Sequence, residues 1–142
     1  MSTLSAASRA AASALAVERL RIEAAVSNMA NAESTRGPDG QPYRRRDVVL
    51  GEAPVEGFDS VLGRAQATGV KVVAVVEDQT PPRRRFEPAH PDADADGYVA
   101  LPNVDPAQEM VDMLGAARAY QANLTAIGLI RDLLQRALEL GR

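Results

Sequence analysis

The chain of 142 residues has no cysteine and no tryptophan, and aromatic residues make up only 4% of it. The absence of cysteine excludes disulfides, thiolate metal sites and cysteine nucleophiles. It also suits a protein that enters an oxidising compartment without mispaired thiols. Because aromatic residues are scarce, a core must be built mainly from alanine and aliphatic residues, which favours close packing of helix on helix.

The sequence also lacks a large excess of one sign of charge and a long apolar run. The net charge is -3, and residues 1–33, 34–103 and 104–142 carry 0, -2 and -1 of it. No segment therefore offers the basic surface that nucleic-acid binding needs. Arg118 interrupts the longest nearly uncharged stretch, residues 113–130, so we expect no membrane span. Residues 10–17 are apolar but follow Arg9 with no basic region before it, which predicts no cleaved signal peptide.

The motifs of common enzymes are absent as well. His90 is the only histidine and lies in a proline-rich turn, away from any nucleophile motif of the G-x-S-x-G kind. Neither a zinc-protease motif nor a phosphate-binding or dinucleotide-binding glycine pattern occurs. We therefore expect no enzyme activity and no cofactor.

The strongest pattern that is present lies in the C-terminal segment. Apolar residues recur there in alternating steps of three and four, a spacing typical of a long helix that faces one partner helix. Asp105 and Pro106 mark its start and Gly141 its end, giving a helix of about 35 residues. The stripe, with the charged Arg131 as its one exception, is Met110, Met113, Ala117, Tyr120, Leu124, Ile127, Arg131, Leu134 and Leu138.

The N-terminal segment shows a similar pattern. Leu15, Ile22 and Met29 recur every seven residues, and no proline or glycine occurs before Gly37. These features predict a helix from Leu4 to about residue 33 that pairs with the C-terminal helix.

Both expected helices carry a second apolar row. A pair of helices buries one face of each, so we expect these rows to lack a partner within the chain and to contact neighbouring subunits. The stripe alone also fits the internal core of an ordinary helical hairpin. The second rows are Val17, Leu20 and Ala24 in the first helix, and Ala119, Ala122, Ala126, Leu129, Leu133 and Leu140 in the second.

The middle of the chain is rich in turn residues and β-branched residues. Gly37 to Gly40 read as a turn, and residues 70–77 are β-branched on both faces, which predicts a central strand. Weaker strand patterns lie near 43–50, 83–87 and 97–101. The chain is thus interpreted as α+β, with an N-terminal helix in 1–33, a small β-rich module in 34–103 and a C-terminal helix in 104–142.

Two charged patterns in the middle have ordinary alternatives. Asp92, Asp94 and Asp96 resemble the first half of a calcium loop, but Asn103 stands where the loop needs glutamate, so we interpret them as a solvated turn. The arginine triplets at 44–46 and 83–85 are offset by nearby acidic residues, which favours ion pairs or solvation over nucleic-acid binding.

Several motifs resemble one family. Residues 27–32, Ser-Asn-Met-Ala-Asn-Ala, and 118–123, Arg-Ala-Tyr-Gln-Ala-Asn, are similar to the signatures of bacterial flagellar axial proteins, the rod and hook subunits. Residues 37–44, 97–105 and 109–112 narrow the resemblance to the proximal-rod subunits. The resemblance covers both ends and much of the middle, and leaves residues 51–69 unmatched.

The resemblance implies a structural subunit of the flagellar drive shaft. Such proteins leave the cytoplasm through the type III export apparatus, associate with themselves, with the rod proteins FlgB, FlgF and FlgG and with the rod-to-ring junction protein FliE, and lie in the periplasm-spanning rod. Together with the seams, it predicts an assembly interface made of Leu15, Ile22, Asn28, Met29, Asn31, Met110, Met113, Ala117, Tyr120, Asn123, Leu124, Ile127, Leu134 and Leu138. The alternatives are a periplasmic helical-hairpin adaptor and a calcium-binding module.

Overall fold

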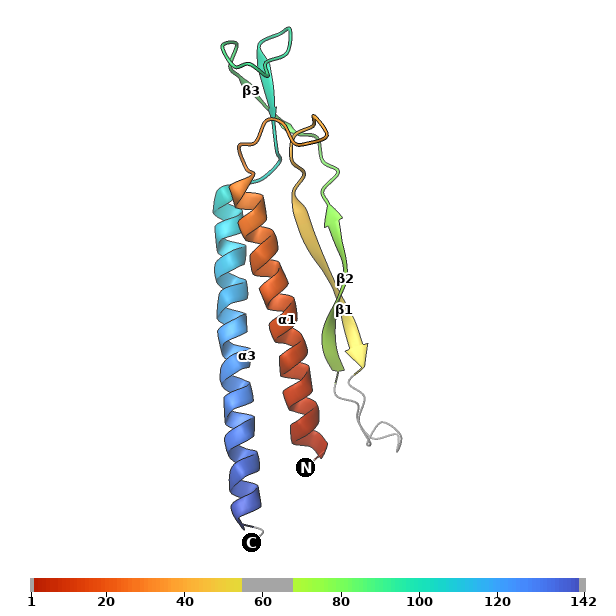
Figure 1. Ribbon diagram of the computed structural model, residues 1–142, viewed down its shortest axis with the longest axis vertical. Helices are drawn as coiled ribbons and strands as arrows, with labels where there is room; N and C mark the ends of the chain where they lie inside the picture. Colours follow the sequence, from red (N-terminus) through yellow and green to blue (C-terminus); the bar gives the residue numbers. More distant parts are fainter. Residues whose placement is uncertain (1, 55–67, 141–142) are drawn as a thin grey trace.

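The computed structural model describes residues 2–54 and 68–140, in which two long helices lie side by side and two β-hairpins complete the fold (Figure 1). The two chain ends lie at the same end of the molecule (Figure 1). The α+β class expected from the sequence is confirmed. The elements are α1 (Ser2–Ala30), β1 (Arg46–Pro54), β2 (Thr68–Glu77), β3 (Arg83–Phe86), β4 (Tyr98–Leu101) and α3 (Pro106–Leu140).

Helix α1 contains 29 residues and spans about 44 Å at 1.5 Å per residue. It ends a few residues before the predicted boundary, because the Asn31 side chain competes for the last carbonyls. The Nδ2 atom of Asn31 donates to the Ser27 carbonyl at 2.8 Å, and its backbone N–H donates to the same oxygen. The chain then turns, and Gly40 N–H donates to the Gly37 carbonyl in the expected turn.

Helix α3 contains 35 residues, as predicted, and spans about 52 Å. Its first turn is capped by Asp105, whose Oδ1 accepts a hydrogen bond from the Ala107 N–H at 2.9 Å. Such a cap satisfies one of the amides that a helix start leaves unpaired. The proposed stop at Gly141 lies outside the described residues.

Strands β1 and β2 form an antiparallel hairpin that runs back along α1 (Figure 1). The strand predicted over 70–77 is confirmed as part of β2, but its expected central position is wrong. β2 pairs only with β1 among the described strands and leaves Val73 and Val75 exposed. Val73 is the unpaired residue of a bulge between the Val49 and Leu50 pairs. Gly51 accommodates it, since a Cβ there would lie 2.6 Å from the Val73 Cγ2 atom.

The hairpin also corrects the expectation that the second row of α1 has no partner within the chain. Val17 is 3% exposed, and Leu20 and Ala24 are half-buried. The Val70 N–H donates to the Ser13 Oγ atom at 3.1 Å, which ties β2 to α1. Val17 is covered, and Leu20 and Ala24 are partly covered, because the β-branched hairpin folds back onto this row. Helix periodicity alone does not predict this arrangement.

Strands β3 and β4 form a second short hairpin at the end of the molecule farthest from the chain ends (Figure 1). Gly97 begins the return strand at φ +81°, where a side chain would also meet Phe86 at 3.0 Å. Below this hairpin the chain has its most buried cluster, where the end of α1, β4 and the start of α3 meet. Its members are Ala25, Ala32, Val99, Leu101, Val104 and Ala116.

Candidate functional site

Helix α3 buries one narrow seam against α1, which we call the inner seam. It keeps the predicted three-and-four spacing and shares four positions with the predicted stripe, but its other positions lie one residue earlier than expected. Ala116 and Ile130 replace Ala117 and Arg131, for example. The inner seam is Met113, Ala116, Tyr120, Asn123, Ile127, Ile130 and Leu134, all buried or half-buried.

The predicted residues of α1 lie partly covered by these contacts. Leu15, Ile22 and Met29 are half-buried, as is Asn31 at the helix end. Asn123 of the inner seam donates through Nδ2 to the Ala119 carbonyl of its own helix at 2.9 Å. The structure therefore brings part of the predicted interface together inside one chain, as the core of a helical hairpin.

The remaining predicted residues of α3 stay uncovered in the single chain. Leu124 is 47% exposed and Leu138 61%. We call this row the flank, because it lies beside the inner seam. The flank is Met110, Ala117, Leu124, Arg131 and Leu138.

A further row of α3 points directly away from α1, and we call it the outer stripe. Leu129 and Leu133 of this row are 61% and 53% exposed. Full burial of one leucine side chain contributes about 1.5–3 kcal/mol, so a row of exposed leucines favours association with other surfaces. The outer stripe is Val111, Leu114, Arg118, Ala122, Thr125, Leu129, Leu133 and Arg136, every one of them exposed.

A hydrogen-bonded junction fixes which row of α3 faces outward. Its centre is Asn28 of α1, which is 1% exposed. The Asn28 Oδ1 atom accepts from the Arg46 N–H at 2.8 Å and from the Tyr43 hydroxyl at 3.0 Å. Its Nδ2 atom donates to the Arg46 carbonyl and to Glu109 Oε2, both at 2.9 Å. One amide thus joins α1, the first residue of β1 and α3.

Glu109 supplies the α3 side of this junction and is 2% exposed. Its Oε1 atom accepts from Arg45 Nε at 2.6 Å. Burial lowers the pKa of Arg45, but the hydrogen bond and the charge of Glu109 outweigh it, so the pKa lies above its ordinary value. Arg45 therefore stays charged and paired with Glu109.

The sequence motifs predicted Asn28 as an assembly contact, but they indicated neither Glu109 nor the role of Arg45. A signal was present, since Glu109 lies four residues before Met113 and so extends the inner seam. A charged residue on an apolar seam needs a buried partner of opposite charge.

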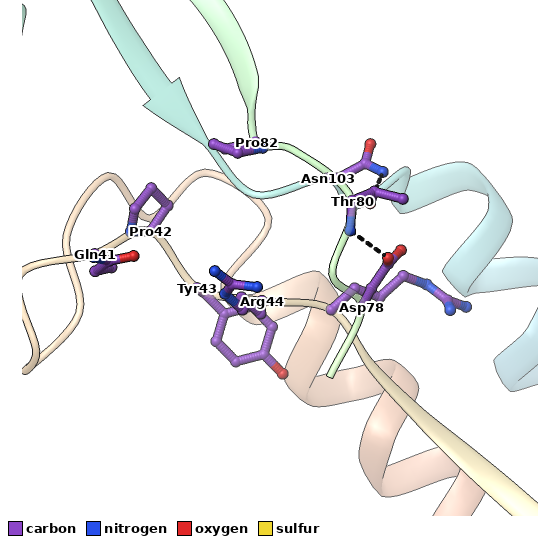
Figure 2. Close-up of a pocket in the computed structure, with 9 residues that line it drawn as sticks. Gln41, Pro42, Tyr43, Arg44, Asp78, Thr80, Pro82 and Asn103 are labelled. Carbon is purple, nitrogen blue, oxygen red and sulfur yellow. Dashed lines mark hydrogen bonds between the residues drawn. The ribbon is translucent and has the colours of Figure 1, made fainter. Parts of the chain in front are cut away.

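A small hollow beside the junction does not have the size of a ligand site. It is lined by the loop after α1, the segment between β2 and β3, and Asn103, and its volume is about 40 Å³ (Figure 2). Asp78 Oδ1 accepts from the Thr80 N–H and Asn103 Nδ2 donates to Thr80 Oγ1 there, both drawn in Figure 2. Small-molecule pockets usually exceed about 300 Å³, whereas this hollow has room for a few waters at most.

Comparisons with known proteins agree with a structural role. A family model described as the C-terminal part of flagellar basal body rod FlgEFG proteins matches residues 95–140. The flagellar basal-body rod protein FlgC of Salmonella typhimurium is 45% identical over 132 residues, which cover 93% of each chain. FlgC of Bacillus subtilis is 40% identical over 141 residues, with 92% of this chain and 93% of that one covered. FlgC of Aquifex aeolicus is 35% identical over 133 residues and 90% of each chain.

The chain belongs to the FlgC family of flagellar basal-body rod proteins. It is a structural subunit of the flagellar rod, and its family is not an enzyme family. As a member of the FlgC family it lies in the flagellar basal body and assembles with other rod components. No helix in the described part of the chain is long and apolar enough to cross a membrane.

In this FlgC-family chain two of the three aspartates of the calcium-like turn bond to different partners. Asp92 accepts from Thr35 Oγ1 at 2.7 Å and pairs with Arg36, while Asp94 pairs with Arg84. The Asp94 pKa is lowered, first by the backbone hydrogen bond from Tyr98 and then by Arg84, against the opposing effect of burial. Within residues 2–54 and 68–140, no three acidic, histidine or cysteine side chains gather as metal ligands would.

Four of the six triplet arginines form ion pairs within the described chain, as their nearby acidic residues suggested, while Arg44 donates to Gln79 and Arg83 to the Pro102 carbonyl. Arg45 contacts Asp47 as well as Glu109, and Arg85 pairs with Glu87 at 2.7 Å. These cations are thus committed to internal contacts, which leaves little of the basic surface that nucleic acid would need.

Proposed function

We propose that this rod subunit assembles through the exposed rows of its terminal helices, and that α1, α3 and the hairpins divide the chain near residues 33 and 104. The observation that carries the proposal is the outer stripe of α3, which no other described element covers. A rod that transmits torque needs many dense contacts along its axis, and two long antiparallel helices supply them in one direction. In this proposal the predicted interface residues of α1 and the inner seam pair the two helices. The flank contacts neighbouring subunits.

The finer placement follows from the resemblance to proximal-rod subunits. We propose self-association together with contacts to FlgB, FlgF, FlgG and FliE in the periplasm-spanning part of the rod. We also propose export through the type III apparatus without a cleaved signal peptide. The absence of cysteine supports this route, because an unfolded chain without thiols crosses into the periplasm without mispairing.

The test is to place a charge on the outer stripe. Leu129→Asp introduces a carboxylate where the proposal needs an apolar contact, whereas Gln121→Asp adds the same charge to an exposed polar position of α3. Each variant replaces the native chain in a flagellated strain, and its amount in purified basal bodies is measured together with swimming. We expect Leu129→Asp to reduce incorporation at least tenfold and Gln121→Asp to leave it within twofold.

The same experiment distinguishes a rod subunit from the alternative, a periplasmic helical-hairpin adaptor. An autonomous hairpin adaptor would stay out of purified basal bodies in the native form as well. Equal incorporation of both variants would contradict the assembly role of the outer stripe. Circular dichroism of the purified variants shows that helix content is retained, since an exposed Leu→Asp change away from the inner seam costs little stability.

A further inference from the structure

The two sides of the molecule differ in shape. Helix α1 lies between α3 on one side and the β1–β2 hairpin on the other (Figure 1). On the hairpin side a groove with a volume of about 480 Å³ separates α1 from the strands. Its apolar lining comes from Leu20 and Ala24 of α1 and from Val48 and Val75 of the hairpin. On the opposite side, α3 presents the outer stripe as a convex apolar ridge.

The groove and the ridge carry exposed charges of opposite sign. Two glutamates line the groove, and Glu23 is paired with Arg19 at 2.9 Å, which leaves Glu77 as the carboxylate open to a partner. Glu77 is half-exposed, and its nearest cation, Arg46, lies at 3.9 Å, near the limit for an ion pair. A cation from another molecule can therefore approach Glu77 at little cost.

The outer stripe carries two arginines, Arg118 and Arg136. Asp132 and Glu139 lie within four residues of Arg136, whereas no acidic residue lies within four residues of Arg118, so the positive charge is concentrated at Arg118. Neither arginine forms an ion pair with the described residues. Arg118 lies four residues after the exposed Leu114, and Arg136 lies three residues after the exposed Leu133. The outer stripe thus offers a partner both an exposed apolar ridge and a positive charge.

We propose that the groove between α1 and the β1–β2 hairpin receives the outer stripe of α3 from a second copy of this chain. This rests on the proposed function and names the partner of the α3 face. Because ridge and groove lie on opposite sides of one molecule, the contact is head-to-tail rather than two-fold. Each copy leaves a free ridge and a free groove for the next copy, so the contact propagates around or along the rod.

The absence of native cysteine allows a direct test by disulfide trapping. Pairs of single-cysteine chains are co-expressed in a strain that lacks the native chain. One chain carries V75C in the groove, and the other carries L114C, A122C or L129C in the outer stripe. Basal bodies are isolated, oxidised mildly and analysed on a non-reducing gel. We expect a disulfide-linked dimer from at least one of these pairs, and the strongest stripe position gives the axial offset between copies.

Matched pairs control for chance contact. A117C in the flank replaces the stripe cysteine while V75C is kept, and each single-cysteine chain is also expressed alone. Dimers from L129C alone would overturn the proposal in favour of a two-fold contact of α3 with α3. Dimers of V75C only with A117C, or no dimers at all in basal bodies that contain the chain, would overturn it too and leave the proposed function intact. If the cysteine-free chain itself does not enter basal bodies, the proposed function fails instead.

A charge swap gives an independent readout. Glu77→Arg and Arg118→Glu each place like charges together if their side chains meet across the contact, and the double variant restores opposite charges. We expect each single variant to lower incorporation about threefold to tenfold, and the double variant to recover more than half of it. Equal and additive losses in the double variant, with no V75C dimers, would contradict the proposed pairing.

Discussion

The two ends of the helix pair are built differently. At the junction end, the buried Asn28 and Glu109 have every polar atom hydrogen-bonded, and a compact apolar cluster lies beside them. Toward the chain ends, the described residues of α3 beyond Ala116 are half-buried at best, and leucines such as Leu129 stay exposed. One end is held by contacts within the chain, whereas the other offers its apolar surface to other molecules.

The difference separates two tasks that one pair of helices has to perform. A subunit that must join a polymer needs a defined orientation of its outward rows, and the junction supplies it through directional hydrogen bonds. It also needs apolar area that is not yet buried, and the distal helices keep that area available. Variants that disrupt each end separately test whether the orientation of the outward rows and the association with other subunits are independent.

The largest effect is expected from breaking the distal end. Leu124→Pro removes the bond from its N–H to the Tyr120 carbonyl and places the proline ring against the preceding turn, at a cost of about 3 kcal/mol or more. We expect loss of the distal part of α3, no detectable chain in basal bodies and no swimming. Amide exchange of the purified protein should still show protection around Asn28 and Glu109.

The control for this variant is Leu124→Ala, which keeps the helix and removes only the side chain. It should retain at least part of the incorporation. Normal swimming with Leu124→Pro, or collapse of protection throughout the junction, would show that the two ends do not act separately.

The next largest effect is expected at the junction. Glu109→Ala leaves Arg45 and the Asn28 amide without their buried partner, and loss of one member of a buried pair typically costs about 3–5 kcal/mol. The free energy of unfolding, measured by denaturant titration, should fall by about that amount. Asn123→Ala is the matched control, because that amide bonds only to its own helix and should cost about 1 kcal/mol or less.

An equal loss in Glu109→Ala and Asn123→Ala would remove the distinction between the two ends. The variant pair also tests whether the junction orients the outer stripe. If it does, Glu109→Ala lowers incorporation into basal bodies even at a temperature where circular dichroism shows its helices to be intact.

Local rules were sufficient to predict the helices. α3 begins at Pro106, directly after its cap Asp105, where the capping rules place its start. No proline or glycine occurs before Gly37, which allows α1 to form as one continuous helix. The buried face of α3 was harder to predict from the sequence, because rows one residue apart, such as Ala116 and Ala117, are equally apolar. Which row is buried depends on the bond from Glu109 to Asn28, two residues 81 positions apart, and periodicity carries no information on such a contact.

The hairpin shows a second limit. A run of valines has the same pattern whether neighbouring strands cover it or, as in β2, a helix covers one side and Val73 stays exposed. The sequence therefore indicated a strand correctly and its surroundings wrongly. The groove between α1 and β2 was unpredictable for the same reason, since it arises from how the hairpin folds back along α1.

The smallest effect is expected at the β3–β4 hairpin, and it tests whether the junction end is uniform. The pKa of Asp94 is lowered by the Tyr98 N–H, assisted by Arg84, so its charged form stabilises the folded hairpin. This contribution is complete above the ordinary carboxyl pKa of about 4 and is lost as the pH falls through the lowered folded value. Asp94→Asn should therefore melt below the native protein at neutral pH, with the gap closing as the pH falls through the lowered folded pKa. Asp96→Asn is the matched control, because the Asp96 carboxylate forms none of these bonds in the described structure.

A difference in melting temperature that persists unchanged in acid would mean that Asp94 acts through its shape rather than its charge. An effect on the amide protection of α3 would mean that the hairpin and the junction unfold together.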